Sequence, residues 1–174
     1  DESGNSVSIN GDGTIVAIGS PWNDGTTTSN AGHVRIYQYD SGNDIWNQLG
    51  QDIDGEAEND YSGKSVSLSS DGTIVAIGGD NNDGTSTDTS HNAGHVRIYQ
   101  YDSGNNIWNQ LGQDIDGEAA DDRSGFSVSI NGDGTIVAIG AYKNDGTSAD
   151  AGHVRIYQYD SGNDIWNQLG NDID

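Results

Sequence analysis

The sequence predicts an all-β protein made of three tandem copies of one four-stranded unit. The first observation is an internal repeat, because one block of residues is identical at 31–43, 93–105 and 151–163. The second is that the apolar residues, 31% of the chain, occur in short β-branched runs between turn residues, which is the pattern of strands. The third is that no segment has a helical period, and glycine, at 26 residues, recurs too often for helices.

Within the first copy we expect strands at 6–9, 14–19, 33–39 and 45–50. Asn-Gly-Asp-Gly at 10–13 and Asp-Ser-Gly-Asn-Asp at 40–44 separate them as turns. The second strand is almost entirely apolar, which predicts burial on both of its faces. The copies differ in length between their second and third strands, so we expect a variable surface loop there.

Four short antiparallel strands joined by tight turns are typical of a β-propeller blade. One such sheet cannot bury both faces alone, so each repeat depends on its neighbours. We expect blades at 1–58, 59–120 and 121–174 that together form one propeller-like domain. Three blades do not close a ring, so this is a partial propeller, half of a six-bladed ring, or part of a longer repeat protein.

The formal charge of −22 comes from 28 acidic and 6 basic residues. Such a surface repels nucleic acids and anionic membranes, so we expect neither as a partner. No apolar run reaches the length of a membrane span. The chain has no cysteine and no methionine, which predicts no disulfide framework and a processed chain. An Asp-rich surface suits an extracellular, secreted or cell-surface location.

Three short motifs recur in the same order in every copy. In the first copy they are Ser3-Gly4-Asn5-Ser6-Val7, Ile18-Gly19-Ser20-Pro21 and Gly32-His33-Val34-Arg35-Ile36-Tyr37. This order resembles the FG-GAP blades of integrin-α-type β-propellers, which implies a propeller fold. The aromatic residue that precedes glycine in that family is serine here. The family's Asp-x-Asp-x-Asp-Gly calcium loop is reduced to one carboxylate per turn, which we expect only to form the turn: Asp12, Asp71 and Asp133.

The connection after the fourth strand is the best candidate for a cation site. Its Asp-x-Asp-Gly-Glu pattern places several carboxylates close together, as hard cations prefer. The candidate ligands are Asp52, Asp54, Glu56, Asp114, Asp116 and Glu118. The alternative is a solvated linker whose Ile53 and Ile115 enter the core between blades. We expect no required cofactor, and calcium as the ion that such a site would take.

The variable loops are the best candidates for ligand binding. They share Asn-Asp-Gly-Thr at 23–26, 82–85 and 144–147, preceded by an aromatic residue or aspartate, and then diverge. An aromatic ring beside Asp and Asn suits sugar stacking and hydrogen bonding. The candidates are Trp22, Asn23, Asp24, Asp80, Asn82, Asp83, Tyr142, Asn144 and Asp145. The alternative is a loop turn with a packed aromatic residue.

The remaining repeated side chains suggest packing. Each His-x-Arg-x-Tyr strand places its three named side chains on one face, where we expect the arginine to bond to neighbouring carboxylates and stack on tyrosine. Trp46, Trp108 and Trp166 are expected in the core at the blade edge.

We expect the chain not to be an enzyme, because its polar features occur three times whereas catalysis needs unlike residues at one place. The preferred function is an extracellular scaffold or filament component that self-associates as a dimer or fibre, or packs on further blades of the same chain. The alternative is a lectin-like or adhesive module that binds glycans or extracellular proteins through the variable loops.

Overall fold

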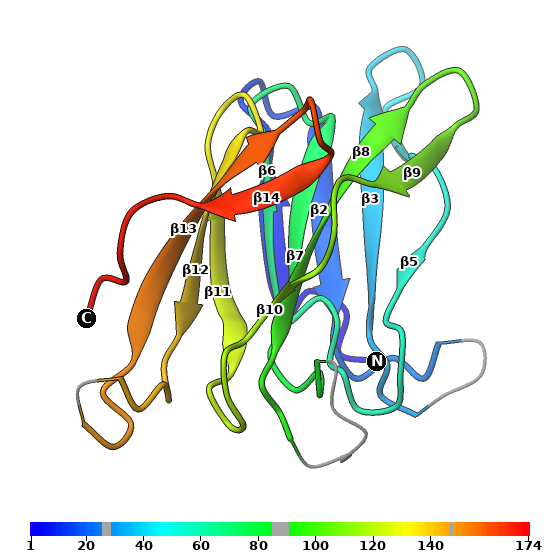
Figure 1. The fold of residues 1–174 in the computed structure, drawn as a ribbon. Coiled ribbons are helices and arrows are strands. Elements are labelled where there is room, and N and C mark those ends of the chain that lie inside the picture. The colour runs from blue at the N-terminus through cyan, green and yellow to red at the C-terminus, as the bar shows by residue number, and fades with distance from the viewer. Residues whose placement is uncertain (26–28, 85–90, 147) are drawn as a thin grey trace.

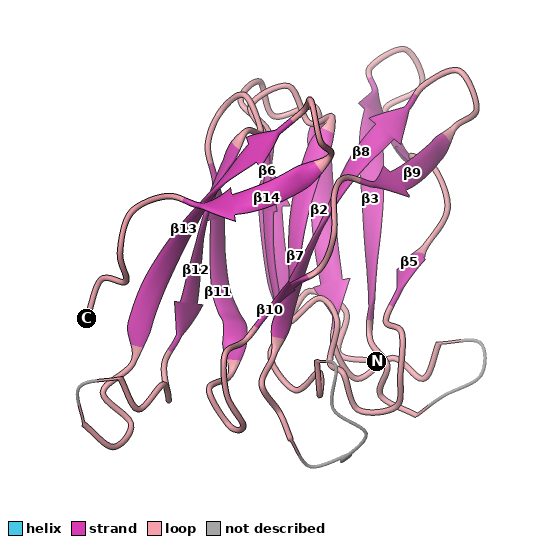
Figure 2. Cartoon of the chain, viewed as in Figure 1, coloured by secondary structure: helices cyan, strands magenta, loops and turns pink. Residues whose placement is uncertain are grey.

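The computed structural model describes residues 1–25, 29–84, 91–146 and 148–174, which form strands and turns without any helix. Accordingly, the described residues include no helix that could span a membrane. The prediction of an all-β fold is confirmed, since three antiparallel sheets follow one another along the chain. Figure 2 shows these strands and the loops that join them.

The first sheet contains β1 (Ser6–Ile9), β2 (Ile15–Ser20), β3 (His33–Asp40), β4 (Ile45–Gln48) and β5 (Ile53–Asp54). The second contains β6 (Ser65–Leu68), β7 (Ile74–Gly79), β8 (His95–Asp102), β9 (Ile107–Gln110) and β10 (Ile115–Asp116). The third contains β11 (Ser124–Ile130), β12 (Ile136–Ala141), β13 (His153–Asp160) and β14 (Ile165–Gln168). The first four strands of each sheet are paired in chain order, as in a propeller blade. The expected unit boundaries at 58/59 and 120/121 stay predictions.

The connections after β4 and β9 differ from the prediction, because each adds a two-residue strand to its sheet. Ile53 of β5 pairs with Val34 of β3, and Ile115 of β10 pairs with Val96 of β8. Both isoleucines are buried, and burial of the apolar side chain stabilises the connection in its position beside the sheet. Part of the expected linker is therefore a fifth strand.

The turn between the first two strands is closed by its own side chains. The Asn10 side-chain oxygen accepts from the backbone N–H groups of Thr14 and Ile15, both at 2.9 Å. Asp12 accepts from the hydroxyl and the N–H of Thr14. Asp71 and Asp133 do the same for the threonine two residues on, so the predicted turn role of these aspartates is confirmed.

The three sheets stand side by side, with the third at the left of Figure 1 and strands β3 and β5 of the first at the right. The first strand of each sheet lies innermost, because β6 contacts both β1 and β11. The second strands, β2 and β7, also approach the following sheet closely, because each carries a glycine at the contact. A Cβ atom on Gly19 or Gly78 would overlap the carbonyl oxygen of Gly63 or Gly125 in the following sheet.

Two apolar cores lie between the sheets. We call the face of a sheet that packs on the following sheet its forward face, and the opposite one its backward face. The forward face of the first sheet carries Ile15, Ala17, Val34, Ile36 and Ile53, and packs on the backward face of the second, with Val75, Ile77, Tyr99 and Trp108. The second core joins the forward face of the second sheet to the backward face of the third by equivalent residues: Ile74, Ala76, Val96, Ile98 and Ile115 against Val137, Ile139, Tyr157 and Trp166.

The two outermost faces have no such cover within the described structure. Trp46, on the backward face of the first sheet, is 45% exposed, whereas its counterparts Trp108 and Trp166 are each 3% exposed. The prediction that all three tryptophans are core is therefore wrong for Trp46. The second strand of each sheet was expected to be buried on both faces. Among β2, β7 and β12, only β7 of the central sheet is buried along its whole length. In both cases burial depends on the neighbouring sheet.

Candidate functional site

One end of the sheets brings together residues that differ between the repeats. Because the first two strands of each sheet are antiparallel, β1, β6 and β11 begin where β2, β7 and β12 end. We call this end the mouth, and it lies at the bottom of Figure 1. The connections into the innermost strands and out of the second strands meet there.

The repeat is broken at the mouth. Before the innermost strands, equivalent positions hold Glu2, Tyr61 and Arg123, and then Asn5, Lys64 and Phe126. After the second strands, equivalent positions hold Pro21, Asp80 and Tyr142, and then Trp22, Asn81 and Lys143. The premise that polar features occur three times is therefore wrong at this end. Unlike residues on a constant frame are the usual make-up of a binding or catalytic site.

The backbone there is held in an uncommon conformation. Glu2, Tyr61 and Arg123 have φ angles of 49°, 55° and 60°, in the left-handed region that side chains other than glycine seldom adopt. Each such residue costs on the order of 1 kcal/mol and persists only where its surroundings impose it. The frame therefore fixes the same backbone three times and places a different side chain on it each time.

Aromatic rings and a lysine form a continuous contact chain across all three sheets. The rings of Trp22 and Tyr61 have centroids 5.8 Å apart, and those of Phe126 and Tyr142 are 4.5 Å apart. Lys64 joins the two pairs, since its Nζ lies 5.2 Å from the Trp22 ring and 5.8 Å from the Phe126 ring. An ammonium group over two ring faces is held by cation–π attraction.

Asp80 lies buried beside this chain at the end of β7, with 6% of its surface exposed. Its Oδ1 has no hydrogen-bond partner within the described structure. Burial raises the pKa of Asp80, and the charges of Lys64 and Arg123 oppose that rise. A buried acceptor without a partner is uncommon in a folded protein, and this oxygen is closed to solvent in the structure. We call Trp22, Tyr61, Lys64, Asp80, Phe126 and Tyr142 the mouth cluster.

The other predicted ligand residues shape their own loops. The side-chain oxygens of the three asparagines accept from the N–H two residues on, at 2.7 to 2.8 Å: Asn23, Asn82 and Asn144. The three aspartates accept from a backbone N–H at the far side of the same loop: Asp24, Asp83 and Asp145. These are the bonds of a loop turn. Thr26, Thr85 and Thr147 of the shared motif lie outside the described residues.

The structure thus brings three of the predicted ligand residues, Trp22, Asp80 and Tyr142, to one place. It adds Tyr61, Lys64 and Phe126, which no repeated feature of the sequence predicts. The sequence marks these positions in the opposite way, because they differ between copies of an otherwise nearly identical repeat. Whether any of them binds a ligand stays a prediction.

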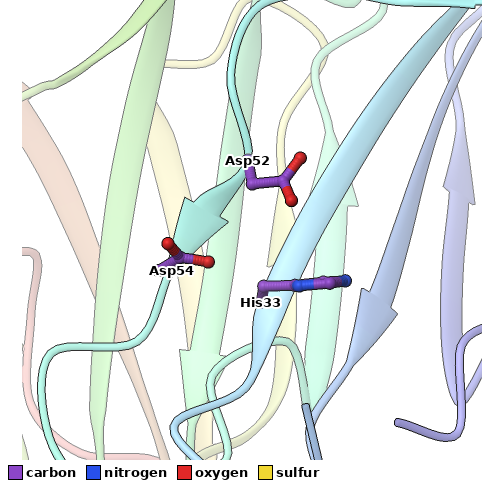
Figure 3. Close-up of side chains that lie close together, drawn as sticks. All are labelled: His33, Asp52 and Asp54. Carbon is purple, nitrogen blue, oxygen red and sulfur yellow. The ribbon is translucent and has the colours of Figure 1, made fainter. Parts of the chain in front are cut away.

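The predicted cation ligands do not form one site. They are divided among three groups whose ligand atoms lie within 4.8 Å of one another: His33, Asp52 and Asp54; Glu56, His95 and Asp114; Glu118, His153 and Asp172. Figure 3 shows the first group, with His33 on β3 and the two aspartates at β5. Asp116 lies outside these groups, and burial raises its pKa.

An arginine already faces each of these groups. Arg35 binds Asp52 at 2.8 Å, and its hydrogen bonds lower the pKa of that carboxyl group. Arg97 lies 3.3 Å from Glu56, and Arg155 lies 3.2 Å from Glu118. Each guanidinium therefore supplies a positive charge where a calcium ion would otherwise do so. Calcium binding at these carboxylates stays a prediction. A calcium ion would have to compete with the arginines for the same oxygens.

Comparisons with known proteins agree on the fold. A putative 6-phosphogluconolactonase from Bacteroides fragilis superposes with a TM-score of 0.62 at 15% identity, over 96% of this chain and 38% of that one. A periplasmic gluconolactonase from Pseudomonas aeruginosa superposes with a TM-score of 0.56 at 14% identity, over 96% of this chain and 38% of that one. At such identities the likeness concerns the fold alone, and the chain spans under two fifths of either structure. The sequence comparison with curated proteins found no significant match.

The expectation that the chain is not an enzyme is overturned by these comparisons. The fold is shared with proteins named as gluconolactonases, so blades of this kind are compatible with catalysis. The symmetry argument fails for a physical reason as well, because the side chains at the mouth are not repeated.

The family comparison identifies one repeat. The matched segment, 115–157, begins at β10 and includes β11, β12 and most of β13. It therefore covers the motifs on which the resemblance was based, in the third copy. Residues 115–157 match the FG-GAP repeat, which confirms the predicted resemblance over this segment.

Proposed function

We propose that the chain is an extracellular scaffold module that assembles by packing blades face to face. The observation that carries the proposal is that each outermost face repeats residues which are buried where two sheets meet. The backward face of the first sheet leaves Trp46 exposed and Val16, Ile18 and Tyr37 only partly buried, whereas their counterparts are in the cores. Further blades of the same chain or a second copy would cover it.

The internal boundaries define what such a contact requires. The Trp108 indole N–H donates to the carbonyl oxygen of Leu49 at 2.8 Å, and the Gln51 side chain both donates to and accepts from the Trp108 backbone at 2.9 Å. Trp166, Leu111 and Gln113 repeat this arrangement at the second boundary. Polar groups thus fix the register while apolar residues supply most of the stabilisation.

The forward face of the third sheet offers the other half of such a contact. Its exposed residues are Val154, Leu169 and Ile173, at 37%, 48% and 55%. Trp46 of an incoming first sheet would meet Leu169 as Trp108 meets Leu49. This contact is head-to-tail, so it either closes into a ring or continues as a fibre.

An extracellular location is supported by the acidic surface and by the FG-GAP repeat at 115–157, a repeat typical of extracellular proteins. The high net charge keeps single copies soluble, and salt or divalent cations that screen the charge are expected to favour assembly. The scaffold role leaves the chemistry of the mouth open.

The test is the assembly state of the purified chain by light scattering and electron microscopy over a range of concentrations and salt. Two variants remove the contact from opposite sides. Trp46→Ala removes the exposed indole. Gly140→Ala adds a Cβ that meets only Ser127 within this chain, where the rotatable hydroxyl must move aside, but it would overlap the backbone of a docked sheet as Gly19 and Gly78 show. Wild type should assemble and both folded variants should not. A wild-type monomer under all conditions would overturn the proposal.

A further inference from the structure

The distribution of positive charge points to the mouth. The chain has six basic residues, and three of them, Arg35, Arg97 and Arg155, belong to the repeat. The other three, Lys64, Arg123 and Lys143, occur once each in connections at the mouth. A chain with a net charge of −22 thus places every cation that is not part of the repeat at one end of its sheets. Arg123 already pairs with Asp121 at 3.8 Å, whereas Lys64 and Lys143 form no ion pair among the residues that the structure describes. The mouth is therefore the place where an anionic group can bind.

Lys64 is the cation whose position is best defined. Its ammonium group lies between the Trp22 and Phe126 rings and forms no ion pair closer than 4.0 Å with any residue that the structure describes. It is only partly buried, so its charge is available from solvent. A ligand carboxylate could bind it without displacing a protein partner.

The aromatic rings offer flat apolar surface beside that charge. Phe126 and Tyr142 are 43% and 48% exposed, although they are in contact with each other. Exposed aromatic faces next to polar groups are typical of sites that stack on the C–H face of a sugar ring. The two rings lie on the third sheet, with Lys64 on the second, so a ligand would bridge two blades.

Asp80 limits which anions fit. Its carboxyl group lies near enough to Lys64 for the two charges to attract, but its Oδ1 is closed to solvent. A compact inorganic anion would satisfy Lys64 but be repelled by this carboxylate and leave the rings unused. A neutral sugar would stack on the rings but leave the lysine unused.

We propose that the mouth cluster binds an acidic sugar, such as a uronic acid unit of a polysaccharide. The sugar ring stacks on Phe126 and Tyr142, and its carboxylate binds the Lys64 ammonium group. The inference is independent of the assembly proposed above, because the mouth cluster lies within one chain.

The test is isothermal titration of the chain with oligogalacturonate, and with a neutral galacto-oligosaccharide of the same length as the comparison. The acidic oligomer should bind at least about tenfold more tightly, equivalent to about 1.4 kcal/mol. Raising the salt to about 1 M, where the Debye length is about 3 Å, should remove most of that preference. Equal binding of both oligomers, or binding of neither, would overturn the proposal.

Substitutions then locate the site. Lys64→Gln should weaken binding of the acidic oligomer by about tenfold, the effect of losing one charge-assisted contact. Lys143→Gln is the matched control, because it removes the same charge from a neighbouring connection but not from between the rings, and should change affinity less than about threefold. If Lys143→Gln weakened binding as much as Lys64→Gln, the attraction would be general and the site wrong. Phe126→Ala, at an exposed position, is a second variant that removes part of the stacking surface and should also weaken binding. Trp46→Ala should bind as wild type does, which separates this inference from assembly.

Discussion

The guanidinium group of Arg97 reaches across the boundary between the first two sheets and donates to the backbone carbonyl oxygen of Asp54 at 2.9 Å. Arg97 is 5% exposed and also faces Glu56. Arg35, the equivalent residue of the first sheet, has no preceding sheet to reach within the described structure. It folds back on Asp52 of its own sheet, with its side chain 43% exposed. The same residue is thus an interface group in one repeat and a surface ion pair in another.

Arg97→Met should destabilise the chain by about 2 kcal/mol, because it leaves the partly buried Asp54 carbonyl without its charged donor. Arg35→Met is the matched control and should cost less than about 1 kcal/mol, as an exposed ion pair contributes little. Urea unfolding followed by tryptophan fluorescence measures both. Equal losses in the two variants would mean that the boundary contact contributes nothing beyond the surface pair.

The tryptophans allow the same comparison for apolar packing. Trp108→Ala should cost about 3–5 kcal/mol, since it opens a cavity in the first core and removes the hydrogen bond to Leu49. Trp46→Ala should cost about 1 kcal/mol or less, because its side chain is already exposed in a single copy. Thermal and urea unfolding of the two variants at low protein concentration measure the difference. A large loss for Trp46→Ala in the monomer would contradict the exposed position.

Local pattern was enough to predict the strands, because every signal used was short-range. The runs at 6–9 and 33–39 match β1 and β3 to within a residue, and the turn role of Asp12 follows from its neighbours in sequence. What the pattern could not predict is burial that depends on the next sheet. Trp46, Trp108 and Trp166 stand in identical sequence, yet only two are buried.

The site was predicted less well than the strands for a related reason. The residues that recur in every copy predict a site at Asn23, Asn82 and Asn144, but these side chains close their own loops. Lys64 and Phe126 were passed over because each occurs once. Only the packing of the innermost strands shows that residues so far apart in sequence lie at one end of the sheets.

His95 should make the chain acid-sensitive. Burial lowers its pKa to about 3 from an ordinary value of 6.5, so the folded state keeps it neutral while the unfolded state takes up a proton. The free energy of unfolding therefore carries its full contribution from the neutral His95 above pH 6.5. Below pH 6.5 it falls by about 1.4 kcal/mol per pH unit until the pH nears 3. Arg97 also lowers this pKa, and Glu56 and Asp114 are the acids that face the ring.

His95→Gln removes that proton uptake, so the stability of wild type relative to the variant should fall steadily between pH 6.5 and about 3. The comparison is needed because burial raises the pKa of Glu56, which acts in the opposite direction as the pH falls. Urea unfolding at several pH values measures the two curves. Parallel curves would show that His95 is not held neutral in the folded state.

The third repeat departs from the other two at the residue that would fix a docked sheet. Gln51 and Gln113 each make two hydrogen bonds with the backbone of a tryptophan in the next sheet, whereas the third copy has Asn171 at this position. Asparagine is one methylene shorter and cannot span the same two groups.

Asn171→Gln should therefore strengthen head-to-tail assembly about tenfold, as two added hydrogen bonds of about 0.5–1.5 kcal/mol each would. Sedimentation of the variant and wild type at matched concentrations measures this, with Asn171→Ala as the control that should not assemble better. If the glutamine variant assembled no better than wild type, its face would not be the one that docks Trp46.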